Sequence, residues 1–381
     1  MRAFPGKPQA GSRVLVPLSW AFQLVVNARN KAYDAGWLRQ HRLPIPVVSV
    51  GNLATGGTGK TPLVILLARC LQRSGRHPAV ISRGYRGANE TRPRHPPLVV
   101  SDGRAEGIPM PPAAETGDEA RLLACRLDGI PVIVCPDRAS AGRLAMDRFH
   151  TDLILLDDGF QHRSLHRDAD VVTLDAADPL SGGRLLPAGG LREPVAGLRR
   201  ADIAVITRAE REDQFLRSQE RVGEIAPKVA VFRAYHRPTR VSWPGETSSS
   251  PAGHAPSPHT AAASSLADVP VAAFAGLARP DSFRSTLEAL GARVVHFVGL
   301  EDHHAYTMEE AHRLVEDGFR KGARLVLTTS KDAARLPHRW IPSRLAVLDI
   351  EMVVENLDSL VQRILALCLQ RFTAPHPVTS R

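Results

Sequence analysis

Residues 47–70 read VVSVGNLATGGTGKTPLVILLARC and predict a strand, a glycine-rich loop and a helix in direct succession. The β-branched run at 47–50 fits a buried strand, and the apolar spacing over 62–73 fits a helix. Between them, small residues leave room for backbone N–H groups to converge on phosphate oxygens at the N-terminus of that helix. This stretch therefore predicts a site for a nucleoside triphosphate.

The end of the loop, Gly59-Lys60-Thr61, carries the side chains that such a site needs. Lys60 would reach the terminal phosphates, and the Thr61 hydroxyl would ligate Mg²⁺. Ala54 stands where the strict pattern has glycine, but an ordinary glycine-rich turn would leave the Gly-Lys-Thr ending unexplained. The predicted ATP-binding residues are Thr55, Gly56, Gly57, Thr58, Gly59, Lys60 and Thr61.

A second apolar run, at 153–156, ends in two adjacent carboxylates, Asp157 and Asp158. Adjacent carboxylates repel each other unless a cation or an arginine neutralises them. A phosphate-binding loop needs acidic groups at the end of a buried strand to complete the Mg²⁺ shell. The alternative is a solvated strand-to-loop turn. We predict that Thr61, Asp157 and Asp158 form the metal site.

Short apolar runs alternate with helical stretches along most of the chain, which predicts a mainly parallel sheet with crossover helices. Predicted strands lie at 47–50, 79–82, 131–135, 153–156, 171–174, 203–207, 229–232, 271–274, 294–298 and 325–328. Predicted helices lie at 62–73, at 119–127, near 282–290, after a capping box at 307–310, and in a last stretch ending at Phe372.

The composition changes sharply at residues 242–268, which are rich in Ser, Pro, Ala and His and nearly lack large apolar side chains. Such a segment builds no core and predicts a linker or insertion. We therefore predict an N-terminal helical segment at 1–44, a phosphate-loop core at 45–241, the linker, and a C-terminal lobe at 269–381. The fold class is α/β: a P-loop NTPase-like, mainly parallel sheet with flanking helices, a smaller C-terminal α/β lobe and an N-terminal interfacial helix.

The charge balance favours anionic partners, because 49 basic residues against 39 acidic ones give a net charge of +10. Nucleic acid is disfavoured, since aromatic residues are only 5% of the chain and no basic stripe with stacking residues occurs. The four cysteines form no CxxC pair, so they predict neither a zinc site nor a disulfide framework.

Residues 14–26 form a mostly apolar run that is shorter than the ~18 residues of a spanning helix. A signal peptide is disfavoured because polar residues and a proline interrupt the run. Trp20 and Phe22, with cationic residues on both flanks, fit a helix that lies in a membrane interface. The alternative is a terminal helix packed on its own domain.

Several blocks of the sequence, taken in order, resemble one family. They are Ser49-Val50-Gly51-Asn52 leading into Gly56–Pro62, Ser82-Arg83-Gly84-Tyr85, Gly117-Asp118-Glu119, Asp157-Asp158-Gly159-Phe160-Gln161-His162, Leu185–Gly189 continuing to Leu191–Pro194, Asp302-His303-His304 and Ser330-Lys331-Asp332. Together they resemble the tetraacyldisaccharide 4′-kinases, the lipid A 4′-kinases of Gram-negative bacteria. The resemblance runs from about residue 45 to 335. It departs from the family at Arg86-Gly87 and in the insertion near residue 250.

The resemblance implies ATP-dependent phosphorylation of the 4′-hydroxyl of a tetraacylated glucosamine disaccharide 1-phosphate, the lipid A precursor. ATP and Mg²⁺ are the implied cofactors. The implied location is peripheral, at the cytoplasmic face of the inner membrane, with its anionic surface as a partner and no obligate protein partner. A lipid substrate favours the interfacial interpretation of residues 14–26, so the resemblance implies that the segment 1–44 associates with the membrane. It also implies that the lobe 269–381 completes the active site. A basic surface suits anionic lipid.

The resemblance also implies roles for single residues. Asp118 would act as general base in a dyad with His303, although an Asp at a helix start is by itself more often a cap. Lys60 would act in catalysis as well as in ATP binding. Lys331 follows a late strand and is assigned to nucleotide binding by analogy alone. The predicted substrate and phosphate contacts are Arg83, Tyr85, His162, Arg192 and Glu193.

Two other functions compete with this interpretation. A phosphate-loop ligase of the dethiobiotin synthetase type would share the core, but not the N-terminal apolar run or the Asp-Asp-Gly-Phe-Gln-His block. A nucleotide-dependent metal chaperone is suggested by the 15 histidines, which are however scattered along the chain. The pair His303-His304 has no third ligand at metal-site spacing.

Overall fold

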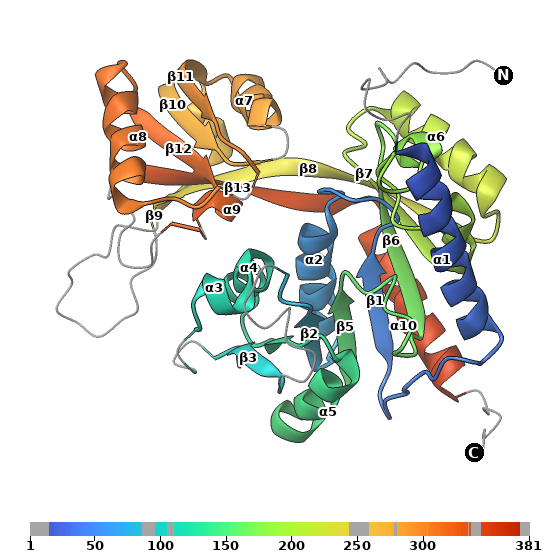
Figure 1. The fold of residues 1–381 in the computed structure, drawn as a ribbon. Helices are drawn as coiled ribbons and strands as arrows, with labels where there is room; N and C mark the ends of the chain where they lie inside the picture. Colours follow the sequence, from blue (N-terminus) through green and yellow to red (C-terminus); the bar gives the residue numbers. More distant parts are fainter. Residues whose placement is uncertain are drawn as a thin grey trace. The chain divides into compact units, whose positions relative to one another are not determined.

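The computed structural model describes residues 15–85, 96–104, 108, 110–243, 259–277, 280–302, 304–333, 335–336 and 344–373. The chain forms two compact units (Figure 1). Unit 1 comprises Met1–Tyr235 and Met352–Arg381, and unit 2 comprises His236–Glu351. Strands β8 (Ala230–Trp243) and β13 (Leu345–Val354) each run from one unit into the other.

Unit 1 is built on a sheet in the order β8-β7-β6-β1-β5-β2-β4-β3. Its other strands are β1 (Val47–Gly51), β2 (Pro78–Ser82), β3 (Leu98–Ser101), β4 (Val132–Val134), β5 (Leu153–Asp157), β6 (Ala169–Asp175) and β7 (Ile203–Thr207). The pairs are parallel except for β3 with β4. Because Val50 is in register with Asp157, the phosphate loop and the acidic pair leave the sheet at the same edge.

Helices cover both faces of this sheet, which is why its strands are apolar on both sides. The helices of unit 1 are α1 (Val16–Asp34), α2 (Lys60–Arg73), α3 (Ala113–Thr116), α4 (Asp118–Arg126), α5 (Arg138–Phe149), α6 (Glu212–Ile225) and α10 (Leu357–Thr373). Val48 and Val50 of β1 pack in the same hydrophobic cluster as residues of α2, α4 and α10. Val47 points to the other face, in a cluster that contains residues of α5.

The last helix corrects one predicted boundary. The sequence suggested a single C-terminal lobe from 269 to 381, but residues from Met352 onward group with unit 1. The reason is hydrophobic packing, because Leu360, Ile364 and Cys368 of α10 are buried in the main core cluster of unit 1.

Unit 2 holds a sheet in the order β11-β10-β12-β13-β8, with β9 paired antiparallel to β8. Its elements are β9 (His259–Ala262), β10 (Pro270–Ala275), α7 (Pro280–Ala289), β11 (Arg293–Gly299), α8 (Met308–Arg320), β12 (Leu325–Thr329) and α9 (Ser330–Ala333). The Thr307 side chain accepts from the Glu310 backbone N–H, so α8 has the predicted cap. The predicted linker was partly wrong, since β9 and a 3₁₀ turn at Ala263–Leu266 fall inside it, while 244–258 lie outside the described residues.

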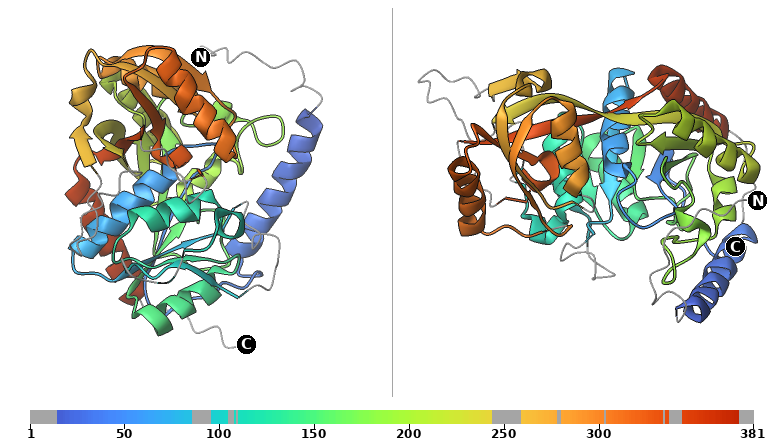
Figure 2. Two further views of the ribbon diagram at one scale, coloured as in Figure 1. Left: turned by 90° about the vertical axis from the view of Figure 1, so that its left-hand side faces the viewer. Right: turned by 90° about the horizontal axis from the view of Figure 1, so that it is seen from above.

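Helix α1 is longer than the predicted apolar run and lies on the outside of unit 1 in every view (Figures 1 and 2). The Ser19 hydroxyl donates to the Leu185 carbonyl at 3.0 Å and accepts from the Ala188 N–H at 2.9 Å. The membrane-interface hypothesis placed Phe22 on the outer face of this helix. In the structure, Phe22 instead packs against a core cluster of unit 1. The outer face exposes Leu18, Trp20, Leu24 and Val25. Within the described part of the chain, no helix is long and apolar enough to cross a bilayer.

Candidate active site

The phosphate loop, residues 51–61, connects β1 to α2 and is shaped by its neighbours. Gly59 adopts φ 87°, a left-handed conformation that is strained for any other residue, and a Cβ there would lie 2.8 Å from Met352 Cε and 3.3 Å from Thr207 Cγ2. The Thr55 N–H donates to the Gly190 carbonyl at 2.7 Å. The Thr58 hydroxyl lies 2.9 Å from Asn52 Nδ2, which donates to it. These contacts fix the loop before any ligand arrives.

The two carboxylates of the acidic pair lie in different environments, and that of Asp158 is cationic. Asp158 has φ 54°, a left-handed conformation that turns its carboxylate toward the start of α2. Lys60 Nζ lies 3.5 Å from Asp158 Oδ1, and Arg192 Nη1 donates to both carboxylate oxygens at 2.9 and 2.7 Å. Burial opposes the ionisation of Asp158, but Lys60 and Arg192 outweigh it and hold its pKa below the ordinary value. Asp158 is therefore an anion with two cationic partners.

Asp157 is 1% exposed and lacks a cation at contact distance in the described part of the chain. Its Oδ2 accepts from the Ser82 hydroxyl at 3.3 Å, and its buried Oδ1 has no hydrogen-bond partner among the described residues. Burial, and then the charges of Glu119 and Asp158, raise the pKa of Asp157 to about 7. A buried carboxylate with an unsatisfied oxygen fits a divalent cation, because the cation would supply both the missing ligand and the missing charge.

Two further sequence blocks meet beside this pair. Gly117 has φ 82°, and a Cβ on it would lie 2.3 Å from the Tyr85 carbonyl oxygen. The blocks that contain Tyr85 and Asp118 are therefore in backbone contact. Gly117 is the N-cap of α4, and Asp118 is its first helical residue, with its acidic side chain in the first turn. The charge of neighbouring Glu119 acts on Asp157, which places the first turn of α4 near the acidic pair.

Comparison with known proteins agrees with this geometry. The chain matches the family model described as Tetraacyldisaccharide-1-P 4'-kinase over residues 11–368. It belongs to this family of kinases. The Tetraacyldisaccharide 4'-kinase of Anaeromyxobacter sp. strain Fw109-5 is 41% identical over 367 residues, covering 95% of this chain and 92% of that protein. The enzyme of the same name from Syntrophus aciditrophicus is 38% identical over 356 residues, covering 91% and 90%.

A solved structure of the same family also matches. The crystal structure of LpxK from Aquifex aeolicus, described as an "apo" form in complex with ATP, is 31% identical with a TM-score of 0.72. The similarity covers 95% of this chain and 99% of that one. The predicted fold class, a mainly parallel P-loop NTPase-like sheet with flanking helices, is confirmed, and so is the predicted family.

Two predicted substrate residues of this kinase lie in environments that limit what they can do. His162 Nε2 lies 3.0 Å from the Ser164 hydroxyl. Burial, with the charge of Arg138 next, lowers the pKa of His162 to about 3, so the ring is neutral at physiological pH and cannot neutralise a phosphate by charge.

Glu193 requires a correction. Its side chain is only 2% exposed. Gln161 Nε2 donates to one carboxylate oxygen at 2.8 Å, and Arg200 Nη2 donates to the other at 2.7 Å. Both oxygens are occupied inside unit 1, so Glu193 holds Gln161 and Arg200 in place and does not face a substrate.

Of the remaining predicted residues, Arg83 and Tyr85 belong to unit 1 and Lys331 to unit 2. Arg83 and Tyr85 are exposed, with Tyr85 at 55%. In unit 2, Lys331 Nζ lies 3.2 Å from Asp302 Oδ1, and His304 Nε2 lies 2.8 Å from Glu310 Oε2. His303 lies outside the described residues.

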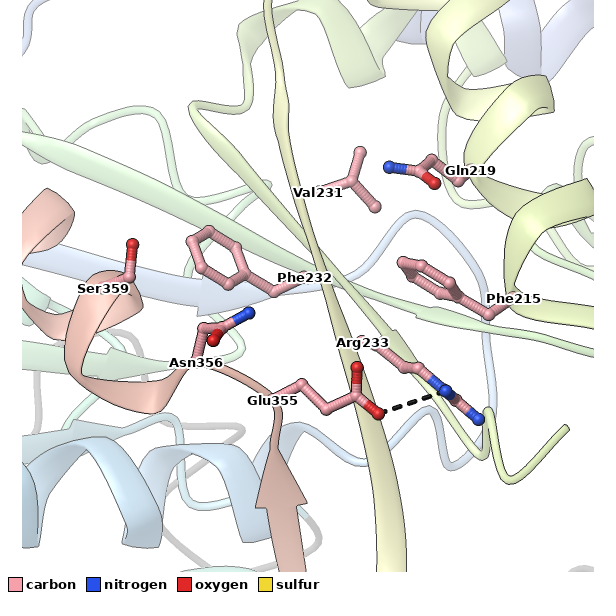
Figure 3. A pocket seen from close by; sticks show the side chains of 8 residues that line it. All are labelled: Phe215, Gln219, Val231, Phe232, Arg233, Glu355, Asn356 and Ser359. Carbon is pink, nitrogen blue, oxygen red and sulfur yellow. Dashed lines mark ion pairs between the residues drawn. The ribbon is translucent and has the colours of Figure 1, made fainter. Parts of the chain in front are cut away.

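Unit 1 also contains a pocket of about 420 Å³ that holds none of the predicted site residues (Figure 3). Side chains from α6, β8 and the start of α10 surround it, and Arg233 Nη1 forms an ion pair with Glu355 Oε1 at 3.1 Å. Its lining residues are Phe215, Gln219, Val231, Phe232, Arg233, Glu355, Asn356 and Ser359. We assign it no part in the reaction proposed below.

The sequence interpretation missed two residues near the phosphate loop. Glu119 was quoted only as part of a block, although its charge raises the pKa of Asp157. Arg208 directly follows β7 and contacts the loop, with Nη2 2.6 Å from the Gly57 carbonyl oxygen. The available signal was positional, because a polar residue just after a parallel strand lies at the same edge as the loop.

Proposed function

We propose that this kinase transfers the γ-phosphoryl group of ATP to the 4′-hydroxyl of a tetraacylated glucosamine disaccharide 1-phosphate. The observation that carries the proposal is the cluster of Lys60, Asp158 and Arg192 at the start of α2, beside a preformed phosphate loop. The name shared by the relatives supports the acceptor, and the ATP in the Aquifex aeolicus structure supports the donor.

The phosphate loop would hold the triphosphate, with Lys60 neutralising charge on the γ-phosphoryl group during transfer. Thr61 and Asp157 would hold Mg²⁺, while Asp158 keeps Lys60 and Arg192 in position. Bound Mg²⁺ would neutralise charge on the phosphate oxygens. This assignment separates two carboxylates that the sequence had treated alike, because of the two only Asp157 has a buried oxygen without a hydrogen-bond partner among the described residues.

The sugar hydroxyl must lose a proton as it attacks. We propose Asp118 as the acceptor, because it begins α4 next to the exposed Tyr85 and close to Glu119, whose charge reaches the acidic pair. His303 would orient the Asp118 carboxylate and stabilise its protonated form. Arg83 and Tyr85 would contact the acceptor, and Lys331 the nucleotide.

A lipid acceptor requires that the enzyme reach the membrane. The outer face of α1 exposes Leu18, Trp20, Leu24 and Val25, with fractions between 58% and 71%. We propose that this face binds the cytoplasmic surface of the inner membrane peripherally, with the net charge of +10 favouring anionic lipid. No obligate protein partner is proposed.

The test is a thin-layer assay with ATP labelled at the γ-phosphate. The acceptors are the disaccharide 1-phosphate lipid, glucosamine, and a biotin precursor that represents the ligase alternative. The proposal predicts label in the lipid alone. Transfer only to a non-lipid acceptor, or hydrolysis of ATP without transfer, would contradict it.

A further inference from the structure

Arg208 has an unusual backbone for its side chain. It directly follows β7 and adopts φ 54°, in the left-handed region. The other described non-glycine residues with positive φ are His150, Asp158, Ser181, Asp268 and Asn356, all with short polar or imidazole side chains. A long side chain rarely adopts this conformation, and residues held there cluster at functional sites.

The strained backbone aims the Arg208 guanidinium at the phosphate loop. Nη2 donates to the Gly57 carbonyl at 2.6 Å, and Nη1 donates to Asp175 Oδ2 at 2.5 Å. The preceding residue acts in the same way, since the Thr207 hydroxyl donates to the Thr58 carbonyl at 2.9 Å. Two successive loop carbonyls are thus held by two successive side chains at the end of β7.

These contacts have a physical consequence for anion binding. A loop binds phosphate when its N–H groups converge on the ligand, which turns its carbonyl groups away toward the protein. Outward carbonyls need donors, and without them the loop is free to adopt other conformations. The apparent affinity for the ligand then falls, because it equals the intrinsic affinity multiplied by the fraction of molecules whose loop is in the binding conformation.

We propose that Arg208 is a positioning residue for the nucleotide: held by Asp175, it fixes the Gly57 carbonyl and so keeps the phosphate loop in its binding conformation. The proposal rests on the proposed function only in taking the loop as the ATP site. Because Arg208 acts through the loop, its removal lowers the binding affinity of every nucleotide that occupies the loop by the same factor. The rate of phosphoryl transfer at saturating ATP stays unchanged.

Arg208→Gly is the most direct variant, because glycine adopts positive φ without strain and removes only the side chain. We expect the dissociation constants of Mg-ATP and Mg-ADP, measured by calorimetry, to rise equally, by about tenfold. The thermal midpoint of the ligand-free protein should stay within about 3 °C of wild type. Arg208→Lys and Asp175→Asn should give intermediate losses, since a lysine cannot span both partners as a fork does.

Arg211→Ala is the matched control, because Arg211 is only three residues away, is 76% exposed and pairs with Asp213 at the surface. It should bind both nucleotides as wild type does. Lys60→Ala separates the two hypotheses: if it binds ATP as well as wild type does, the loop is not the ATP site and the proposed function fails.

Three results would overturn the role of Arg208 alone. One is unchanged affinity for both nucleotides in Arg208→Gly. Another is a loss confined to ATP together with a fall in kcat, which would mean direct contact with the γ-phosphate. The third is a thermal midpoint that falls by more than about 3 °C together with the affinity for both nucleotides, which would mean that Arg208 stabilises the fold in general. If the glycine variant does not fold, Arg208→Lys is judged by the same criteria.

Discussion

The phosphate loop and the outer face of α1, both in unit 1, differ in how their side chains are held: the loop by polar contacts, the face of α1 by none, among the described residues, that fixes its exposed apolar groups. Around the loop, polar contacts fix the position of each group: Asn52 holds Thr58, Thr207 and Arg208 hold loop carbonyls, and Asp158 pairs with Lys60. On α1, Trp20 and Leu24 are 65% and 71% exposed. Binding a triphosphate through directed hydrogen bonds requires groups in preset positions, whereas the proposed attachment of α1 to a fluid membrane requires only apolar area.

This contrast predicts that substitutions at the loop change the rate of the chemical step or the affinity for nucleotide. Substitutions on the outer face of α1 should change only the binding of the lipid substrate and of vesicles. The largest effect is expected for Lys60→Ala, which removes the charge that we propose stabilises the transferring phosphoryl group. We expect kcat/KM to fall by about a thousandfold or more, with the fold retained by circular dichroism. Near-native turnover at saturating ATP would contradict the assignment of the loop.

Asp118→Ala should come next, with kcat lowered by about a hundredfold, the usual scale for a lost general base, and KM for ATP nearly unchanged. His303→Ala should be milder. If the two residues form the proposed dyad, the double variant should lose less than the product of the two separate factors. Independent losses, measured by steady-state kinetics, would show that no dyad exists.

On α1, replacing Trp20 and Leu24 together by Glu should raise KM for the lipid by about tenfold and weaken binding to anionic vesicles. The KM for ATP should not change. Leu216→Glu is the matched control, because Leu216 is 53% exposed on α6 and is not part of α1. If the α1 variant binds vesicles as tightly as wild type does, α1 serves only as a packed terminal helix.

The smallest expected effect is on the folding stability of the protein, through the titration of the buried carboxyl of Asp157. Its pKa is raised to about 7 in the folded protein, above that of the unfolded chain, so the folded state holds the proton more tightly. Its contribution to stability is therefore full at low pH and is lost as pH rises through about 7, at up to about 1.4 kcal/mol per pH unit.

Asp157→Asn keeps the shape of the side chain and removes this titration. Urea unfolding at pH 5 and pH 7.5, without Mg²⁺ or nucleotide, should show a smaller loss of stability with rising pH in the variant than in wild type. Parallel pH dependences for the two proteins would mean that Asp157 is not a strained buried carboxylate.

The sequence predicted the core well, because strands buried on both faces appear as nearly continuous apolar runs, as in β5 and, apart from Ser49, in β1. It missed α6, a mostly polar helix whose fourteen residues bury only Ser218 and Val222. It also missed that α10 packs on unit 1, since an apolar helix face does not indicate which core it covers.

For the site, spacing identified Lys60 and the acidic pair, because motif positions follow from the strand-loop-helix order. Sequence could not separate Asp157 from Asp158, as their difference comes from Arg192, which lies 34 residues further along the chain. Nor could it show that Glu193 is buried between Gln161 and Arg200. Both depend on tertiary contacts that leave no local pattern.

The position of the transferred phosphate is the most direct test of the central claim. Wild-type protein would be incubated with Mg-ATP and the disaccharide 1-phosphate lipid in anionic vesicles, and the product examined by ³¹P–¹H correlation NMR. The account predicts a new phosphate monoester coupled to the proton on the 4′ carbon, which is absent with Lys60→Ala. A phosphate on any other position, or the same product formed at the wild-type rate by Lys60→Ala, would contradict it.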